Sequence, residues 1–284
     1  MKIGIEFDYK LGFGRWGDEK YKKLRQIGFD AVDFSMINTE TELYGEGGEK
    51  ILIHEKALAK EAGIEIHQCH GPWRFPPKDN TCEDRAERME KMKKSIRMAS
   101  ILGCKNWVVH PLMPYGIEVI GTENTQKSWD INIEFMKELV ETAKEYDVTI
   151  CYENMPMQKF SLAQPKDILR VVDEINDDHF KVCLDTGHVN VFENILDVAE
   201  EVRRVGDMIQ VMHIHDNKWQ FDMHLAPYYG FINWEEFARA LKDIGFKGVF
   251  SLEVMPPEKL PDDIYYRQAE SLYKIAKHIS DMAE

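Results

Sequence analysis

Hydrophobic positions along the chain follow two alternating patterns. Eight short runs rich in Val, Ile, Phe and Cys are too brief for helices and predict β-strands. A longer segment of helical periodicity follows each run. The predicted strands cover residues 2–8, 31–36, 64–70, 106–110, 148–154, 180–185, 208–215 and 248–254, and the predicted helices cover residues 18–27, 49–62, 83–102, 124–146, 164–175, 195–204, 234–244 and 264–282.

Glycine marks the end of several predicted helices. Gly28, Gly63, Gly103 and Gly245 each precede a strand, and glycine tolerates the left-handed conformation that ends a helix. The same order of helix end, glycine and strand recurs in the stretches IGFDAVDF, AGIEIHQC, LGCKNWVV and IGFKGVFS. The pattern predicts that one strand–helix unit repeats eight times without an intervening linker.

Alternation of strands and helices requires parallel strands joined by crossover helices. Eight such units predict closure into a (β/α)8 TIM barrel, and 284 residues is a usual length for one. We therefore expect a single domain over residues 1–284. The alternative is an open doubly wound sheet, but the glycines of KLGFGRWGD after the first strand lack the G-x-G-x-x-G spacing of a dinucleotide site.

Composition and charge disfavour several classes of protein. The chain is 44% hydrophobic and 30% charged, which is ordinary for a globular protein. Its 36 basic against 50 acidic residues give a net charge of −14, which disfavours binding to nucleic acid. The five cysteines form no C-x-x-C pair, and the sequence has neither the pattern of a signal peptide nor an apolar run long enough for a membrane span. We expect a protein of the reducing cytoplasm that binds no membrane.

Side chains that can bind metal stand where the predicted strands end, and active sites of such barrels lie at that end. A single histidine or carboxylate there is more often structural, but six successive strands that end this way indicate convergence. Carboxylates gathered there would repel one another unless a cation binds them, and imidazole with carboxylate suits Zn²⁺, Mn²⁺, Co²⁺ or Fe²⁺. The residues are His70, His110, Glu153, Asp185, His188, His213, His215, Asp222, His224 and Glu253.

Strand parity limits the roles of two of these histidines. Because side chains alternate along a strand, His213 and His215 share one face and Ile214 takes the other. Both histidines cannot easily occupy one coordination position. We expect one of them to bind the metal and the other to contact a metal ligand or the substrate, and parity alone leaves open which.

The strand-end motifs resemble those of the xylose-isomerase-like TIM barrel superfamily, which contains sugar and sugar-phosphate isomerases and epimerases and also endonuclease IV. The resemblance covers nearly the whole chain, and its specific part is YEN, LDTGH, HIHDN…DMHLAP…INW and LEVM. In the single-metal sugar enzymes of this group, the ligands are Glu, Asp, His and Glu from strands five to eight. The resemblance implies one divalent metal ion (Mn²⁺, Zn²⁺ or Co²⁺) bound by Glu153, Asp185, His213 and Glu253, with His215 as an open alternative to His213.

The endonuclease-like members bind three zinc ions through a larger set of ligands, and every position of that set has a match here. Beyond the four ligands above, the matches are His70, His110, His188, Asp222 and His224. Together with His215, these residues are expected to bind a second metal ion or the substrate. The full set leaves a zinc phosphodiesterase acting on abasic DNA as an alternative, although APYYG replaces the endonuclease's usual LGEG.

The resemblance implies an isomerase or epimerase that acts on a small sugar or sugar phosphate. Glu153 and Glu253 would remove and return a proton next to a carbonyl, through an enediolate stabilised by the metal. Trp16 and Trp73 are expected to line the sugar pocket.

Several features of the function stay open at this point. Arg74 and Lys218 are candidate phosphate binders that the sequence alone does not place. A lyase of the inosose-dehydratase kind would use the same enolisation and is a further alternative. A homo-oligomer is also left open.

Overall fold

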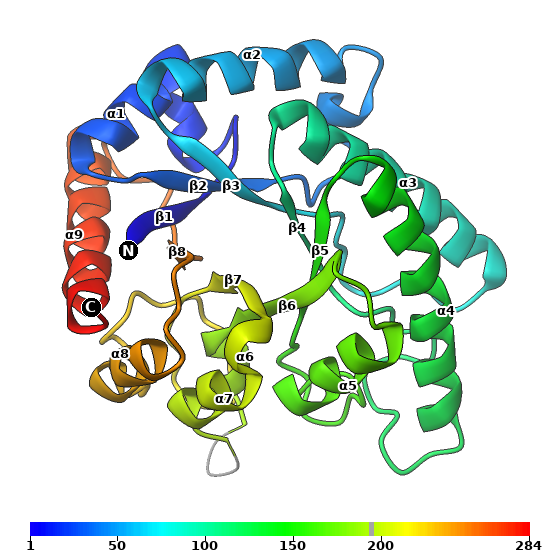
Figure 1. The fold of residues 1–284 in the computed structure, drawn as a ribbon. Coiled ribbons are helices and arrows are strands. Elements are labelled where there is room, and N and C mark those ends of the chain that lie inside the picture. Colours follow the sequence, from blue (N-terminus) through cyan, green and yellow to red (C-terminus); the bar gives the residue numbers. More distant parts are fainter. Residues whose placement is uncertain (193–195) are drawn as a thin grey trace.

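Within residues 1–192 and 196–284, which this computed structural model describes, eight strands form a ring and the helices lie outside it (Figure 1). The strands are β1 (Lys2–Phe7), β2 (Ala31–Ser35), β3 (Glu65–His70), β4 (Asn106–Val109), β5 (Thr149–Glu153), β6 (Phe180–Asp185), β7 (Ile209–His213) and β8 (Val249–Leu252). Each agrees with its predicted range to within two residues at either end.

A longer helix follows each strand. These helices are α1 (Lys20–Ile27), α2 (Gly48–Ala62), α3 (Cys82–Leu102), α4 (Asn124–Glu145), α5 (Pro165–Ile175), α7 (Val198–Val205), α8 (Trp234–Asp243) and α9 (Asp262–Met282). Periodicity did not predict the short elements η1 (Gly12–Glu19), η2 (Glu42–Tyr44), α6 (Thr186–Asn190) and η3 (Gly206–Met208), which are too brief for a helical period. The predicted start of one helix, residue 195, lies outside the described residues.

The strands are parallel and follow the order β7-β6-β5-β4-β3-β2-β1-β8. The ring is completed just beyond the end of β7, where the Ile214 N–H donates to the Ser251 carbonyl at 2.9 Å. The Glu253 N–H donates in turn to the Ile214 carbonyl at 3.0 Å. The prediction of a (β/α)8 TIM barrel is therefore confirmed, while the prediction of a single domain over residues 1–284 stays a prediction.

Side chains inside the barrel lie in layers. One layer consists of small, fully buried side chains from four adjacent strands: Val108, Cys151, Cys183 and Val211. Because alternate residues of a strand share a face, the residues two places further on also point inward. Those residues are His110, Glu153, Asp185 and His213. An apolar layer thus supports a polar one at the carboxyl ends of the strands.

The structure also bears on the predicted surroundings of the protein. None of the helices in the described part of the chain is long and apolar enough to cross a membrane. The cysteines are all free, and four are buried while Cys82 is exposed. Burial raises the pKa of the Cys151 thiol well above its ordinary value, so this thiol stays protonated and unreactive.

Candidate active site

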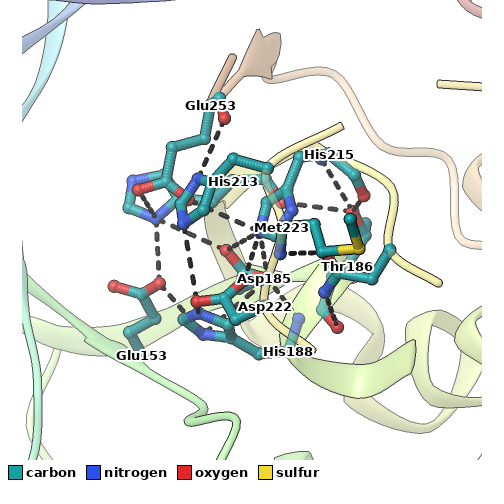
Figure 2. Close-up of polar contacts among 12 residues, drawn as sticks. Glu153, Asp185, Thr186, His188, His213, His215, Asp222, Met223 and Glu253 are labelled. Carbon is teal, nitrogen blue, oxygen red and sulfur yellow. Dashed lines mark hydrogen bonds and ion pairs between the residues drawn. The ribbon is translucent and has the colours of Figure 1, made fainter. Parts of the chain in front are cut away.

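Glu153, Asp185, His213 and Glu253 meet at the carboxyl ends of β5 to β8. One possible ligand atom from each lies within 4.8 Å of the others. His213 Nδ1 lies 2.9 Å from Glu153 Oε1, 3.5 Å from Glu253 Oε1 and 3.9 Å from Asp185 Oδ2. The side chains are buried, and the two glutamates reach the group from different sides (Figure 2). We call these four residues the central cluster.

A carboxylate from β2 contacts the His213 ring on the edge that faces away from the other three residues of the central cluster. His213 Nε2 lies 2.8 Å from Asp33 Oδ2, and Gln68 Nε2 donates to the same oxygen at 3.0 Å. If Nε2 donates its proton to Asp33, the lone pair of Nδ1 faces the central cluster. That tautomer is the one a metal ligand requires.

His215 lies beside the central cluster on the same face as His213. Its Nε2 is 3.1 Å from Asp185 Oδ1, 3.6 Å from Glu253 Oε2 and 3.8 Å from Asp222 Oδ1. His224 stacks on the His215 ring, with 4.3 Å between ring centroids and 5° between ring planes. His213 and His215 therefore both reach the site, as parity predicts, but they contact different carboxylates most closely.

In the motif LDTGH, the short helix α6 places His188 beside the site. Asp185 is the N-cap of α6, and its Oδ1 accepts from the His188 N–H at 2.6 Å. This turn places His188 Nε2 3.2 Å from Asp222 Oδ2, while its Nδ1 lies 2.8 Å from the Asn154 carbonyl. Asn154 also accepts from the backbone N–H of Asp185, so β5 fixes the start of α6.

The ends of β3 and β4 supply a third side of the site. His110 Nε2 lies 2.9 Å from Glu153 Oε2 and 3.2 Å from His70 Nε2. Trp73 lies edge-on against the His110 ring, with 4.5 Å between centroids. Trp16 lies instead in η1 and packs against Phe13, Tyr265 and Tyr266. Among the described aromatic contacts, those of Trp73 reach the site and those of Trp16 do not.

Two acidic residues of the site escaped sequence reasoning. Asp33 is in contact with His213, and Glu6 pairs with Asp33 in the β1–β2 register. Burial and the charge of Asp33 raise the pKa of Glu6, against the imidazoles of His224 and His213. The available signal was a carboxylate inside an apolar strand rather than at its end, in GIEF and AVDF.

The charge of the central cluster fits a bound cation. Burial and the carboxylates of Asp185 and Glu153 raise the pKa of Glu253 well above its ordinary value, against the attraction of His213. Glu253 Oε2 is buried without a hydrogen-bond partner among the described residues. Buried like charges and an unsatisfied oxygen are costly, and a divalent ion relieves both.

The outer histidines differ in their protonation. Burial lowers the pKa of His110 to about 4, so this ring is neutral at pH 7. Burial would also lower the pKa of His188, but Asp185 and Asp222 raise it to about 10. Asp222 likewise raises the pKa of His224 to about 9 against burial. In the absence of metal, protons therefore supply the positive charge that balances these carboxylates.

Fold and site together define a (β/α)8 barrel with a buried group of imidazoles and carboxylates at the carboxyl ends of its strands. Residues 21–275 match the family described as xylose isomerase-like TIM barrel. The chain belongs to this family, and the family resemblance drawn from the sequence motifs is confirmed.

Several relatives carry the names of sugar epimerases. A D-psicose 3-epimerase of Enterocloster bolteae is 28% identical over 268 residues, covering 89% of this chain and 82% of that protein. The crystal structure of a D-tagatose 3-epimerase-like protein is 25% identical, has a TM-score of 0.77 and covers 100% of this chain and 98% of its own. These relatives confirm the prediction of an isomerase-class enzyme.

Other relatives match only about half of the chain, and their names are not those of sugar epimerases. An uncharacterized protein of Methanocaldococcus jannaschii is 32% identical over 166 residues, which is 58% of this chain and 56% of that protein. A probable endonuclease 4 of Metamycoplasma arthritidis is 27% identical over 162 residues, which is 53% of this chain and 56% of that protein. Similarity within the family therefore extends to both branches that the motifs resemble.

Proposed function

We propose that the protein is a divalent-metal-dependent epimerase or isomerase of a ketose, free or substituted. The observation that carries this proposal is the central cluster. It combines two buried glutamates from strands that are not neighbours with an aspartate and a histidine between them. The names of the sugar-epimerase relatives support the same class of substrate.

Glu153, Asp185, His213 and Glu253 would hold the cation, and their chemistry suits Mn²⁺, Zn²⁺ or Co²⁺. When bound, the ion would supply positive charge to the oxygens of the substrate. The contact between Asp33 and His213 keeps the imidazole oriented for this role. Burial of the cluster excludes water from the carboxylates.

The two glutamates would transfer the proton. Removal of a proton next to a carbonyl needs a base within hydrogen-bond reach, and its return to the opposite face needs a second group on that side. Glu153 and Glu253 approach the cluster from different sides (Figure 2). One would therefore take the proton from one face of the carbon, and the other would deliver a proton to the opposite face.

A second group of possible ligands adjoins the first. Asp185, His188 and His215 each offer one atom within 4.8 Å of the others. Asp222 Oδ2 lies 3.2 Å from His188 Nε2, and His224 stacks on His215. We propose these residues for a second cation or for substrate hydroxyls. Elemental analysis of the purified protein separates the two, because a second cation requires two equivalents of metal.

Zinc-dependent phosphodiester cleavage is the second candidate function. The observation in its favour is that His70, His110, His188 and Asp222 all lie in one connected group with Glu153 of the central cluster. The net charge of −14 opposes binding of a polyanionic duplex. We therefore place this function second.

The proposed function is tested by proton exchange into ketoses. The metal-loaded enzyme is incubated with a panel of ketoses in D₂O, and NMR follows deuterium at the carbon next to the carbonyl. Glu153→Gln and Glu253→Gln retain a carbonyl oxygen that can bind metal but cannot accept the proton. We expect metal to be retained and turnover to fall by roughly 10²–10⁴-fold, the usual effect of losing a general base.

Asp185→Asn is the matched comparison. Asp185 is proposed as a ligand without a proton-transfer role, so its loss should act through metal affinity. Excess metal should partly restore the rate of Asp185→Asn and should leave the two Gln variants slow. If both Gln variants exchange and turn over like the wild type, the two glutamates are ligands only and the proton-transfer mechanism is wrong.

A further inference from the structure

A cavity opens on the same end of the barrel, next to the site. It has a volume of about 200 Å³ and lies between the segments that follow β2 and β3 and the first turns of α3. Its walls include Asn38, Trp73, Arg74, Glu87, Arg88 and Lys91. Trp73 belongs to both places, because it lines this cavity and also contacts His110 of the site. We call this space the distal cavity.

Two guanidinium groups of the distal cavity have unused donors. Arg74 Nε and Arg88 Nη2 are buried and have no hydrogen-bond partner among the described residues. Arg88 is only 5% exposed, and its Nη1 is fully engaged with Asp79 at 2.7–2.8 Å. An unpaired buried donor is destabilising, so an acceptor oxygen from a ligand would stabilise both groups.

The charges around the distal cavity are balanced. Arg88 pairs with Asp79 at 2.7 Å, and Lys91 pairs with Glu87 at 2.8 Å. Glu40, which also lines the cavity, lies 4.0 Å from Lys91. Glu40 and Glu87 of the wall, together with the Asp79 that pairs with Arg88, balance the three basic side chains of the wall, which leaves no excess positive charge to favour a phosphate dianion. A neutral ligand with acceptor oxygens fits better.

The size of the distal cavity and the chemistry of its walls limit the class of ligand further. About 200 Å³ is several times the roughly 30 Å³ of a water molecule and below the roughly 300–1,000 Å³ of pockets for drug-sized ligands. The aromatic ring of Trp73 and the nearby Pro72 and Ile37 supply an apolar wall. A sugar ring presents apolar C–H faces and hydroxyl edges, so it can use this wall and the arginine donors together.

We propose that the distal cavity is a subsite for a neutral glycosyl group attached to the ketose, so that the preferred substrate is a glycosyl-ketose rather than a free monosaccharide. The reacting ketose would lie at the central cluster and the attached sugar beyond Trp73, between Arg74 and Arg88. This inference rests on the proposed function for the position of the ketose, but its direct test is a binding measurement that needs no turnover.

The test compares three ligands on the metal-loaded enzyme by isothermal titration calorimetry. They are a ketose, a disaccharide that ends in the same ketose, and the terminal phosphate ester of that ketose. Hydrogen bonds from a charged guanidinium are stronger than those between neutral groups, so we expect the disaccharide to bind at least about tenfold more tightly than the free ketose. We expect the phosphate ester to gain no such advantage.

Two variants test whether the preference for the disaccharide arises in the distal cavity. Arg74→Gln should remove most of the preference for the disaccharide over the ketose. Arg88→Lys keeps a cation beside Asp79 but removes the second nitrogen, and it should also reduce the preference. Arg97→Gln is the matched control, because Arg97 is an exposed residue of the same helix and forms an ion pair with Glu49 instead. It should leave the preference unchanged.

Each outcome of these binding experiments supports or overturns the proposed subsite. Equal binding of disaccharide and ketose, or a preference that survives Arg74→Gln and Arg88→Lys in folded protein, overturns the subsite. Tightest binding of the phosphate ester, lost in Arg74→Gln, would make the cavity an anion site and would also overturn it. If the disaccharide is preferred through Arg74 but no ketose exchanges its proton, the subsite stands and the proposed epimerase function fails.

Discussion

His213 illustrates how much the site depends on both ring nitrogens of one side chain. Nδ1 faces Glu153 at 2.9 Å, and Nε2 faces Asp33 at 2.8 Å. Burial alone would lower the pKa of His213, but Cys183 and the carboxylates around the ring raise it well above its ordinary value. A cation at the cluster would take the place of the Nδ1 proton, while the Nε2 proton would stay on the Asp33 side.

Replacement of Asp33 tests this orientation. Asp33→Ala leaves His213 Nε2 without its acceptor, so we expect metal affinity to fall by roughly 10–100-fold, as for other residues that orient metal-bound histidines. Metal affinity is measured by competition with a fluorescent chelator, without reference to turnover.

Asp33→Asn is the control for Asp33→Ala. An amide oxygen can still accept from both His213 and Gln68, so most of the metal affinity should remain. Asp33→Ala protein that unfolds cooperatively and binds metal as tightly as the wild type would mean that Asp33 has no orienting role.

At the scale of an element, the connection between β7 and α8 carries part of the site. Asp216 anchors it, because its Oδ1 accepts from the N–H groups of Phe231 and Ile232 and its Oδ2 accepts from the Trp234 indole. Asp216 and Leu225 also exchange two backbone hydrogen bonds of 2.7 and 2.9 Å. Asp222 and His224 lie between these anchor points, so their positions depend on Asp216.

We expect Asp216→Ala to loosen this connection without opening the barrel. Each buried donor left unpaired costs about 1–3 kcal/mol, so the free energy of unfolding should fall by at least that amount. Hydrogen exchange measured by mass spectrometry should rise in residues 217–232 and stay low in the barrel strands. Asp216→Asn can still accept from the backbone N–H groups and should lose less. Unchanged exchange in residues 217–232 of the Ala variant would contradict the anchoring role.

At the scale of the whole molecule, the hydrophobic core is large enough to fold the barrel without metal. The core surrounds the strands and continues under most of the described helices. We expect a chelator to abolish activity and leave a cooperative unfolding transition, unlike a small zinc domain whose folding depends on its ion. Circular dichroism during thermal unfolding checks this. Loss of the cooperative transition in chelator would show that the metal is structural.

The charge of the whole molecule governs the competing nucleic-acid function. The densest basic run, at Lys91, Lys93 and Lys94, lies on α3, where Lys91 pairs with Glu87 and Lys93 pairs with Glu138. We therefore expect no tight binding to duplex DNA with an abasic site at physiological salt. Fluorescence anisotropy measures this. Nanomolar affinity with a steep dependence on salt would favour the phosphodiesterase. The expected cytoplasmic location and the open question of a homo-oligomer stay predictions.

The sequence alone determined the barrel and the strand ends. Hydrophobic periodicity depends on neighbours in the chain, so the strands and the main helices could be located without coordinates. Parallel strands place their carboxyl ends on one side, so residues such as Glu153, Asp185 and Glu253 could be grouped by position alone.

Only the tertiary structure decided which side chains touch. Asp33 precedes His213 by 180 residues, and their contact depends on the order and register of the strands around the ring. Local pattern does not encode such register, so sequence reasoning did not assign Asp33 and Glu6 to the site. Sequence pattern also could not distinguish the two tryptophans predicted to line the pocket. Trp73 contacts His110 of the site, whereas Trp16 packs against Tyr265 of α9. The distal cavity likewise exists only because three separate segments of the chain enclose one space.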